Sequence, residues 1–222
     1  MSADPFAGFD LETRIAERGR KSGLELDDDA IAAMATHARA VLEHNDRLHL
    51  TTVTDPAEFL ERHIGESIEG AALLDPKARG RLVDLGSGNG YPAIPVAAIR
   101  RGLDPVCVEA SETKAAFLGE TLAASLGRGK VWNMQVQRPG DFADPTPVRV
   151  LTSRAMGNWE RILPRCSSAL APNGIAMLWA GDAVKQIATR DSWRRLNLVA
   201  RHALPGRLRS WIWCFNVPRQ SE

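Results

Sequence analysis

Residues 83–92 read Val83-Asp84-Leu85-Gly86-Ser87-Gly88-Asn89-Gly90-Tyr91-Pro92. The apolar residues that open this stretch are typical of a short buried strand, and three glycines follow at the strand end. Glycine lets the backbone turn sharply and come close to a bound molecule. The stretch therefore predicts a ligand-binding turn that joins the first strand of a sheet to a helix.

From this point onward, short apolar runs alternate with helical stretches. The runs lie at 82–85, 106–108, 131–136, 148–152 and 175–180. Such alternation is typical of repeated β–α units on a mainly parallel sheet. Two final runs, 196–204 and 210–217, lie on either side of Pro205-Gly206 and predict an antiparallel hairpin at the sheet edge. We expect an α/β fold of the Rossmann-like class.

The residues before the glycine loop have helical periodicity. Helices are expected at about 11–20, at 27–50, and from Asp55 to about Leu74, where Asp55-Pro56-Ala57-Glu58 resembles a capped helix start. These helices are too few to form a core of their own, and 222 residues suit one domain. We therefore expect a single domain, 1–222, in which a helical appendage (1–76) precedes the Rossmann-like core (77–222).

Composition argues against several other classes of protein. No apolar run is long enough to span a bilayer, and the N-terminus lacks a signal-peptide pattern, so we expect a cytoplasmic protein without a membrane partner. The three cysteines, Cys107, Cys166 and Cys214, are scattered and are expected to be reduced. The histidines have no metal-ligand spacing, so no metal site is predicted.

Charge is unevenly distributed, although the net charge is only +1. Residues 1–76 carry 7 basic and 16 acidic side chains, residues 77–159 carry 11 and 7, and residues 160–222 carry 10 and 4. This asymmetry indicates either an anionic partner for the later half or solvated helix faces. Arg190, Arg194 and Arg195 correspondingly form either a contact to the phosphates of such a partner or ordinary surface. Trp211 and Trp213 share a strand face that either packs in the core or stacks on bases.

Acidic residues on both sides of the glycines bear on the identity of the ligand. Asp84 precedes them, and Glu109 ends the second strand, where a carboxylate can accept hydrogen bonds from both ribose hydroxyls. Residues 88–93 also fit the dinucleotide pattern, in which a pyrophosphate binds at a helix N-terminus. The glycines begin at Gly86, before the dinucleotide pattern starts, and Asp84 lies two residues before Gly86. These two features favour S-adenosylmethionine over NAD. The candidate cofactor-binding residues are Asp84, Gly86, Gly88, Gly90 and Glu109.

Further motifs lie on both sides of this loop. They are HNDRLHLT at 44–51, RHIGES at 62–67, YPAIP at 91–95, Glu109 with Lys114, Phe117 and Leu118, RPGD at 138–141, and Ser153-Arg154-Ala155. Together they resemble the motifs of the bacterial 16S ribosomal RNA guanine-N7 methyltransferases (RsmG or GidB). The resemblance runs from about His44 to Ala180, which is most of the chain.

The resemblance implies S-adenosylmethionine as the cofactor and small-subunit ribosomal RNA as the substrate. It implies cofactor contacts from Gly86, Tyr91, Pro139, Gly140 and Arg154, and it places His63 near the cofactor pocket. Residues 138–140 are an unusual form of the family segment, and the sequence also departs from the family pattern at three single positions that bear on the substrate side more than on the cofactor side. They are His44 in place of Trp, His49 in place of Asn, and Ala180 in place of Lys.

The chemistry of guanine N7 agrees with this motif set. That nitrogen has a free lone pair, so it can attack an electrophilic methyl group without a base, and catalysis is mainly positioning. Arg154 and Arg138 are the candidate catalytic residues, which can hold the phosphate backbone or a flipped base. We expect a monomer that acts on free small-subunit RNA or on an assembling particle. The alternatives are a methyltransferase for a small molecule or protein, and a non-catalytic S-adenosylmethionine-binding relative.

Overall fold

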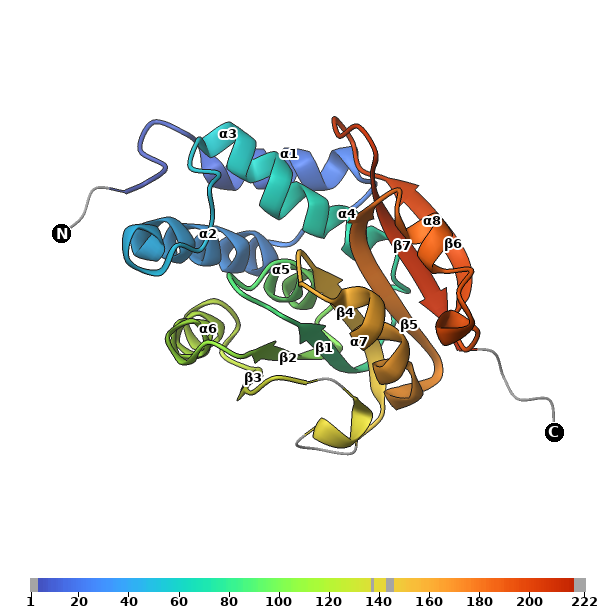
Figure 1. Cartoon of the computed structure of the whole chain (residues 1–222). Helices are drawn as coiled ribbons and strands as arrows, with labels where there is room; N and C mark the ends of the chain where they lie inside the picture. Colours follow the sequence, from blue (N-terminus) through green and yellow to red (C-terminus); the bar gives the residue numbers. More distant parts are fainter. Residues whose placement is uncertain (1–3, 137, 143–145, 218–222) are drawn as a thin grey trace.

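The computed structural model describes residues 4–136, 138–142 and 146–217, and its centre is a seven-stranded sheet (Figure 1). The strand order is β3-β2-β1-β4-β5-β7-β6; the first five strands along the chain pair in parallel, and the β6–β7 hairpin is antiparallel. The bounds are β1 Gly80–Leu85, β2 Leu103–Glu109, β3 Lys130–Asn133, β4 Val148–Arg154, β5 Leu170–Gly181, β6 Asn197–Ala203 and β7 Ser210–Asn216. This topology confirms the Rossmann-like fold and the edge hairpin that the sequence predicts.

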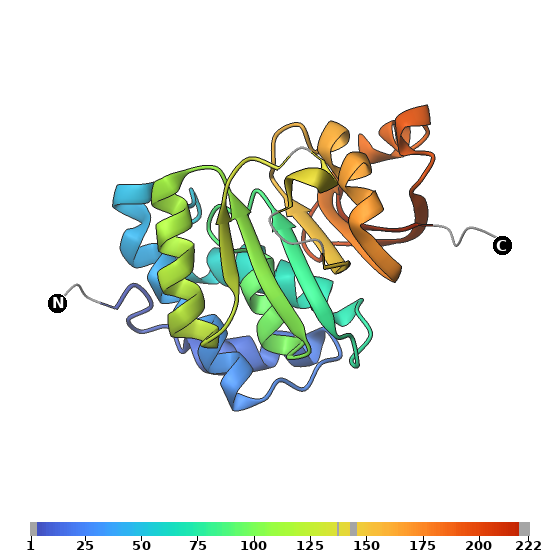
Figure 2. The ribbon, with the colours of Figure 1, turned by 90° about the horizontal axis from the view of Figure 1, so that it is seen from below.

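Helices cover both faces of the sheet (Figure 2). One face carries α1 Leu11–Lys21, α2 Asp28–Leu48, α3 Pro56–Phe59, α4 Glu66–Ala72, α5 Ala93–Ile99 and α6 Glu112–Leu126. The opposite face carries α7 Trp159–Cys166 and the short α8 Val184–Ile187. The acid-rich N-terminal helices and the arginine-rich α7 therefore lie on opposite sides of the sheet.

The helix predicted from Asp55 to Leu74 begins as expected but is not regular. The Asp55 carboxylate accepts a hydrogen bond from the backbone N–H of Glu58 at 2.9 Å, and Pro56 occupies the first turn. Residues Leu60–Gly65 then form a π-helical turn before α4 begins. Such turns are frequent at functional sites, and the spacing of apolar residues does not reveal them.

The strand predicted over 131–136 is wrong beyond Asn133. β3 is an edge strand whose single neighbour is β2, and Asn133 pairs with the last residue of β2, Glu109. No strand extends past that point to continue the ladder. The chain therefore leaves the sheet, and the backbone N–H of Met134 donates to the carbonyl oxygen of Glu109 at 3.1 Å.

The two tryptophans of β7 differ in burial. Trp213 is buried in the core, as expected, and Trp211 is half-buried beside it. The guanidinium of Arg201 lies 5.4 Å from the ring centre of each tryptophan. Because Arg201 covers this pair, core packing and cation–π contact account for both rings.

The N-terminal helices share a hydrophobic cluster with the sheet. Phe59, Ile64 and Ile68 are buried in the same cluster as Leu82 of β1 and Ile94 of α5. A shared core of this kind supports the single domain that we propose for residues 1–222.

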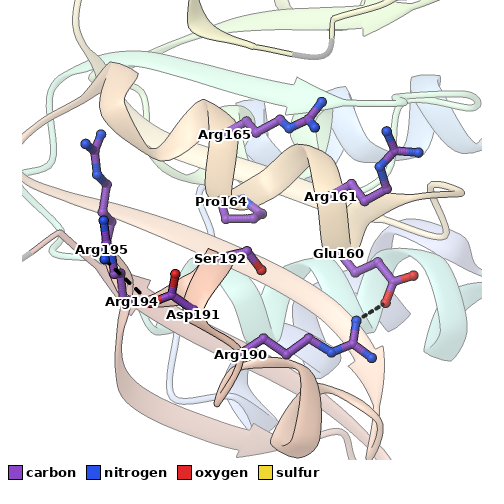
Figure 3. Close-up of a pocket in the computed structure, with 9 residues that line it drawn as sticks. All are labelled: Glu160, Arg161, Pro164, Arg165, Arg190, Asp191, Ser192, Arg194 and Arg195. Carbon is purple, nitrogen blue, oxygen red and sulfur yellow. Dashed lines mark hydrogen bonds and ion pairs between the residues drawn. The ribbon is translucent and has the colours of Figure 1, made fainter.

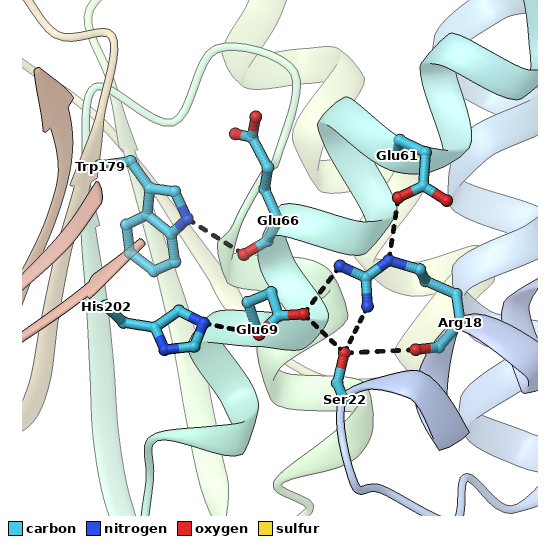
Figure 4. Close-up of polar contacts among 7 residues, drawn as sticks. All are labelled: Arg18, Ser22, Glu61, Glu66, Glu69, Trp179 and His202. Atoms are coloured by element: carbon cyan, nitrogen blue, oxygen red, sulfur yellow. Dashed lines mark hydrogen bonds and ion pairs between the residues drawn. The ribbon is translucent and has the colours of Figure 1, made fainter. Parts of the chain in front are cut away.

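A polar network joins these helices to the edge of the sheet (Figure 4). The guanidinium of Arg18 in α1 pairs with Glu69 of α4 at 2.8 Å and with Glu61 at 3.0 Å, and the Ser22 hydroxyl donates to Glu69 at 2.9 Å. The second carboxylate oxygen of Glu69 lies 2.8 Å from Nε2 of His202 in β6. One largely buried carboxylate thus links α1, α4 and the final hairpin.

Among the described residues, no helix combines the length and apolar character needed to cross a membrane. In the same part of the chain, no group of three or more His, Cys, Asp or Glu side chains is arranged to hold a metal ion. The three cysteines are free and buried.

Candidate functional site

Two adjoining cavities lie at the carboxyl ends of β1, β2 and β4, the edge where ligands bind in open α/β sheets. Gly86 and Glu109 line both of them. The smaller cavity, of about 140 Å³, has apolar walls that include Val108, Val136, Met156 and Ile162. The larger cavity, of about 560 Å³, is polar; its walls include residues 49–53, Arg62, His63, residues 86–89, Tyr91, Lys114 and Arg154.

The loop between β1 and α5 shapes the boundary of the two cavities. Its glycines have positive φ angles: 73° at Gly86, 52° at Gly88 and 89° at Gly90. A Cβ atom at Gly90 would lie 2.7 Å from Cδ1 of Ile94 and 2.9 Å from Nε2 of His37. Gly90 does not line the cavity itself, but both of its neighbours do. The loop therefore needs glycine at this position for both its backbone angle and its space.

Glu109 holds the loop as well as lining the cavities. One carboxylate oxygen accepts a hydrogen bond from the backbone N–H of Gly88 at 2.9 Å, and the other accepts from the N–H of Ser111 at 2.8 Å. Each oxygen has a second lone pair left for a ligand hydroxyl. This geometry is compatible with the predicted ribose contact and adds a structural role that spacing alone does not reveal.

Asp84 lies behind the loop rather than on a cavity wall. Its side chain is buried, and one carboxylate oxygen accepts a hydrogen bond from the Thr152 hydroxyl at 2.7 Å. Burial raises the pKa of Asp84 to about 6. The backbone carbonyl of Asp84 accepts a hydrogen bond from the Ser87 hydroxyl at 2.9 Å, which fixes the start of the loop. The structure therefore places Asp84 as a support of the loop.

Tyr91 is stacked between two histidine rings. The ring centres of His37 and Tyr91 are 4.1 Å apart, and those of Tyr91 and His63 are 5.0 Å apart, each with an interplanar angle of 25°. Nε2 of His37 lies 2.7 Å from the carbonyl oxygen of Asn89, to which it donates. Burial lowers the pKa of His37 to about 4, so this ring is neutral. The stack fixes the second half of the loop against α2.

Arg154 ends β4 and lies on the wall of the larger cavity. Its Nη2 donates to Nδ1 of His63 at 3.1 Å and lies 3.6 Å from a carboxylate oxygen of Glu66. Because Nδ1 of His63 accepts, its Nε2 carries the proton and donates to the Thr51 hydroxyl at 2.8 Å. Burial, reinforced by the charge of Arg154, lowers the pKa of His63 to about 3. The other terminal nitrogen of Arg154, Nη1, is buried without a hydrogen-bond partner in the described structure.

These residues fit S-adenosylmethionine. The apolar cavity suits a nucleobase, and the shared wall offers the Glu109 carboxylate to a ribose. Arg154 lines the polar cavity, and its guanidinium, whose Nη1 has no partner in the described structure, suits an anionic or carbonyl acceptor.

The segment 138–141 lies apart from both cavities. Arg138 is exposed and pairs with Asp141 at 3.1 Å, and Gly140 is exposed in a short 3₁₀ turn, Pro139–Asp141. Arg138 lines a separate hollow with Met134, Gln135, Asp141 and Arg165. The side chain of Pro139 lies outside the described part of the structure. The structure therefore does not bring Arg138 or Gly140 to Arg154.

Sequence reasoning missed several residues that build the site. His37 is three residues after Met34 and four before Val41 on the buried face of α2, so helical spacing could have found it. Thr51 and Glu66 lie within the motifs at 44–51 and 62–67, but sequence spacing does not reveal their roles, which depend on contacts with His63 and Arg154.

The three departures from the family pattern also differ in position. His49 lines the larger cavity. His44 packs against Phe117, with ring centres 5.5 Å apart, and its Nδ1 donates to the carbonyl oxygen of Ala40. The carbonyl oxygen of Ala180 accepts a hydrogen bond from Trp213. Of these three residues, His49 is the one that lines the larger cavity.

Comparisons with solved structures agree with the fold. The chain is similar to an S-adenosylmethionine-dependent O-methyltransferase from Thermotoga maritima, with a TM-score of 0.56, 18% identity, and coverage of 82% of this chain and 73% of that one. It is also similar to a fibrillarin pre-rRNA processing protein from Methanococcus jannaschii, with a TM-score of 0.55, 16% identity, and coverage of 65% and 69%.

Sequence comparisons are more specific. The chain is 33% identical to the ribosomal RNA small subunit methyltransferase G of Sorangium cellulosum over 80% of this chain and 75% of that protein. It is 31% identical to the protein of the same name from Solibacter usitatus over 82% of this chain and 87% of that protein. The family model described as "rRNA small subunit methyltransferase G" (GidB) matches residues 30–199. The chain therefore belongs to the GidB family of rRNA small subunit methyltransferases.

Proposed function

We propose that this protein transfers a methyl group from S-adenosylmethionine to N7 of a guanine in small-subunit ribosomal RNA. One observation carries the proposal: four motif segments that are far apart in the sequence line a single cavity. They are residues 49–53, Arg62-His63, the glycine loop and Arg154-Ala155. Family membership gives this cavity its expected reaction.

S-adenosylmethionine supplies an electrophilic methyl group when it is bound. The residues proposed to hold it are the glycine loop, Glu109 at the ribose and Arg154 on the polar side. Tyr91 shapes the loop through its two ring stacks. Asp84 supports the loop from behind, and Pro139 and Gly140 are proposed contacts on the resemblance alone.

The side chains around the loop suit positioning more than proton removal. Both oxygens of Glu109 accept backbone hydrogen bonds, and both ring nitrogens of His63 are engaged with Arg154 and Thr51. Asp84 lies behind the loop, bonded to Thr152. Guanine N7 needs no base, so a site that orients the nitrogen toward the methyl group is sufficient. Arg154 is the proposed catalytic residue, and the exposed Arg138 is proposed to contact RNA phosphate.

His49 is the observation that favours a different substrate. It lines the larger cavity where the resemblance leads us to expect Asn, so it places an imidazole ring where an amide is expected. A methyltransferase for a small molecule or protein is therefore the second candidate function. We further propose that the protein acts as a monomer in the cytoplasm, on free RNA or on an assembling particle.

Mapping of N7-methylguanosine tests the proposed function. Small-subunit ribosomal RNA from cells with and without this gene is expected to differ at one guanine, which is methylated only when the gene is present. The purified protein is expected to restore that methyl group in vitro. Identical methylation maps, with methyl transfer to a small molecule or protein, would favour the second candidate.

Replacing Glu109 with alanine is expected to weaken S-adenosylmethionine binding about tenfold or more, because a hydrogen bond to a charged group contributes about 1.5–3 kcal/mol. The melting temperature should also fall, since Gly88 and Ser111 lose their acceptor. Calorimetry measures the affinity, with S-adenosylhomocysteine as a second ligand and NAD as a non-binding one. The exposed Glu120 of α6 offers a control, Glu120→Ala, which should bind S-adenosylmethionine normally. Unchanged affinity of Glu109→Ala would exclude the ribose contact.

A further inference from the structure

A basic hollow lies apart from the two cavities, between α7 and the segment 190–195 (Figure 3). Its volume is about 530 Å³, and five arginines line it: Arg161 and Arg165 from α7, and Arg190, Arg194 and Arg195 from the facing segment. All five are exposed, and Pro164 and Ser192 lie between the two rows. We call this hollow the arginine groove.

Carboxylates neutralise only part of the arginine groove. Arg190 pairs with Glu160 at 3.1 Å, and Arg194 pairs with Asp191 at 3.5 Å. Within the described residues, Arg161, Arg165 and Arg195 have no carboxylate at ion-pair distance. Exposed ion pairs contribute little to stability, so folding alone does not explain five arginines at one place.

The groove rests on a rigid base. The buried ring of Trp193 packs against Trp159 with ring centres 5.8 Å apart and against Phe215 at 5.2 Å. Its Nε1 donates to the carbonyl oxygen of Glu160 in α7 at 3.0 Å. These contacts hold both walls in place before any partner binds, which reduces the entropy lost on binding.

The charge of the rest of the chain favours this face for a polyanion. Residues 1–76, with 16 acidic against 7 basic side chains, cover the opposite face of the sheet. Residues 160–222 carry 10 basic against 4 acidic side chains. A polyanion is therefore favoured at the five arginines of the groove over the acid-rich N-terminal helices.

The groove is connected to the cofactor cavities by shared residues. Arg165 lines both the groove and the hollow that holds Arg138. Met134 and Gln135 line both that hollow and the apolar cavity that Glu109 borders. The groove therefore adjoins the hollow that holds Arg138, and that hollow adjoins the apolar cavity of the candidate site.

We infer that the arginine groove binds the sugar–phosphate backbone of the RNA substrate, an inference that rests on the proposed function. Arginine presents a planar fork of donors that matches phosphate oxygens, and two rows of arginines with a gap between them suit a backbone lying along the groove. Phosphate contacts of this kind fix the position of the RNA without reading its bases.

The test is a triple variant, Arg161→Gln, Arg165→Gln and Arg195→Gln. The matched control, Arg20→Gln, Lys77→Gln and Arg79→Gln, removes the same charge from exposed positions in the N-terminal part of the chain. Binding is measured over a series of salt concentrations, with an unmodified transcript of small-subunit ribosomal RNA, alone and assembled with its ribosomal proteins. The groove variant is expected to bind RNA about tenfold more weakly or worse at low salt. Because three phosphate contacts are lost, the plot of log affinity against log salt concentration should become less steep, by about 2 in slope. The control variant should change RNA affinity by less than about threefold, because it loses only the long-range attraction that three positive charges give at any surface position.

The outcomes separate the groove from the proposed function. S-adenosylmethionine affinity and kcat at saturating RNA should be retained by the groove variant, while KM for RNA rises. Unchanged affinity and salt slope for both RNA forms would overturn the inference and leave the proposed function intact. A loss of affinity for the protein-containing particle, with unchanged affinity for the RNA alone, would also overturn the inference, because the groove would then contact a ribosomal protein. Wild-type protein that methylates no RNA would instead contradict the proposed function.

Discussion

Replacing Arg154 with alanine is expected to lower methyl transfer to small-subunit ribosomal RNA by about a hundredfold or more, on the scale of one lost positioning contact. His63 holds one terminal nitrogen of the guanidinium at 3.1 Å, and the other is buried without a partner in the described structure. The side chain is thus fixed in place with one donor left for a ligand. Arg154→Lys should not rescue activity, because an ammonium group lacks the planar fork. Single-turnover transfer of a labelled methyl group measures both variants.

The control for this prediction is Glu66→Gln. Glu66 is buried, which raises its pKa, and its oxygens lie 3.6 Å from Arg154 and 3.6 Å from Arg207. Both Arg154→Ala and Glu66→Gln should lower the melting temperature and retain the circular dichroism spectrum, because each breaks a buried ion pair. Glu66→Gln should retain transfer within a few-fold. If it lost as much transfer as Arg154→Ala, Arg154 would act only through the ion pair; near-normal transfer by Arg154→Ala would remove it from the site.

Replacing Gly90 with valine is expected to weaken S-adenosylmethionine binding by roughly thirtyfold to a hundredfold, which corresponds to about 2–3 kcal/mol of backbone strain and displacement. The φ angle of 89° lies in a region that β-branched residues avoid, and the new Cβ would lie 2.9 Å from the ring of His37. That ring is held by Asn89 and by its stack on Tyr91, so relief of the clash must move the loop. Calorimetry measures the loss.

Gly127 provides the matched control for this effect. It has a φ of 63° at the C-terminal end of α6, and a Cβ there would have no atom within 4 Å. Gly127→Val carries similar backbone strain away from the cavities, so it should lower the melting temperature and leave cofactor affinity unchanged. Equal losses of affinity in the two variants would show that the effect comes from general destabilisation and not from the loop.

The fold could be predicted because its signals are local. The strand runs at 82–85 and 148–152, the turn at Pro205-Gly206 and the cap at Asp55 depend on periodicity and on short-range hydrogen bonds. The end of β3 at Asn133 could not be predicted, since it depends on where β2 stops beside it.

The candidate site was predictable where a motif and the cavity coincide, as at Gly86, Glu109 and Arg154. It was not predictable where a role depends on a partner distant in sequence. The neutral state of His63 depends on burial and on Arg154, 91 positions away. The arginine groove is a second example. The sequence indicated a basic face at Arg190, Arg194 and Arg195, but it did not indicate that α7 lies opposite this face.

The link between Glu69 and His202 also affects how the protein is made. Glu69 and Arg18 are translated early, whereas their partner in β6 follows Glu69 by 133 positions. A single domain generally folds as a unit. The contact between Glu69 and His202 therefore forms only after β6 has been synthesised, and until then this oxygen of Glu69 lacks its histidine partner.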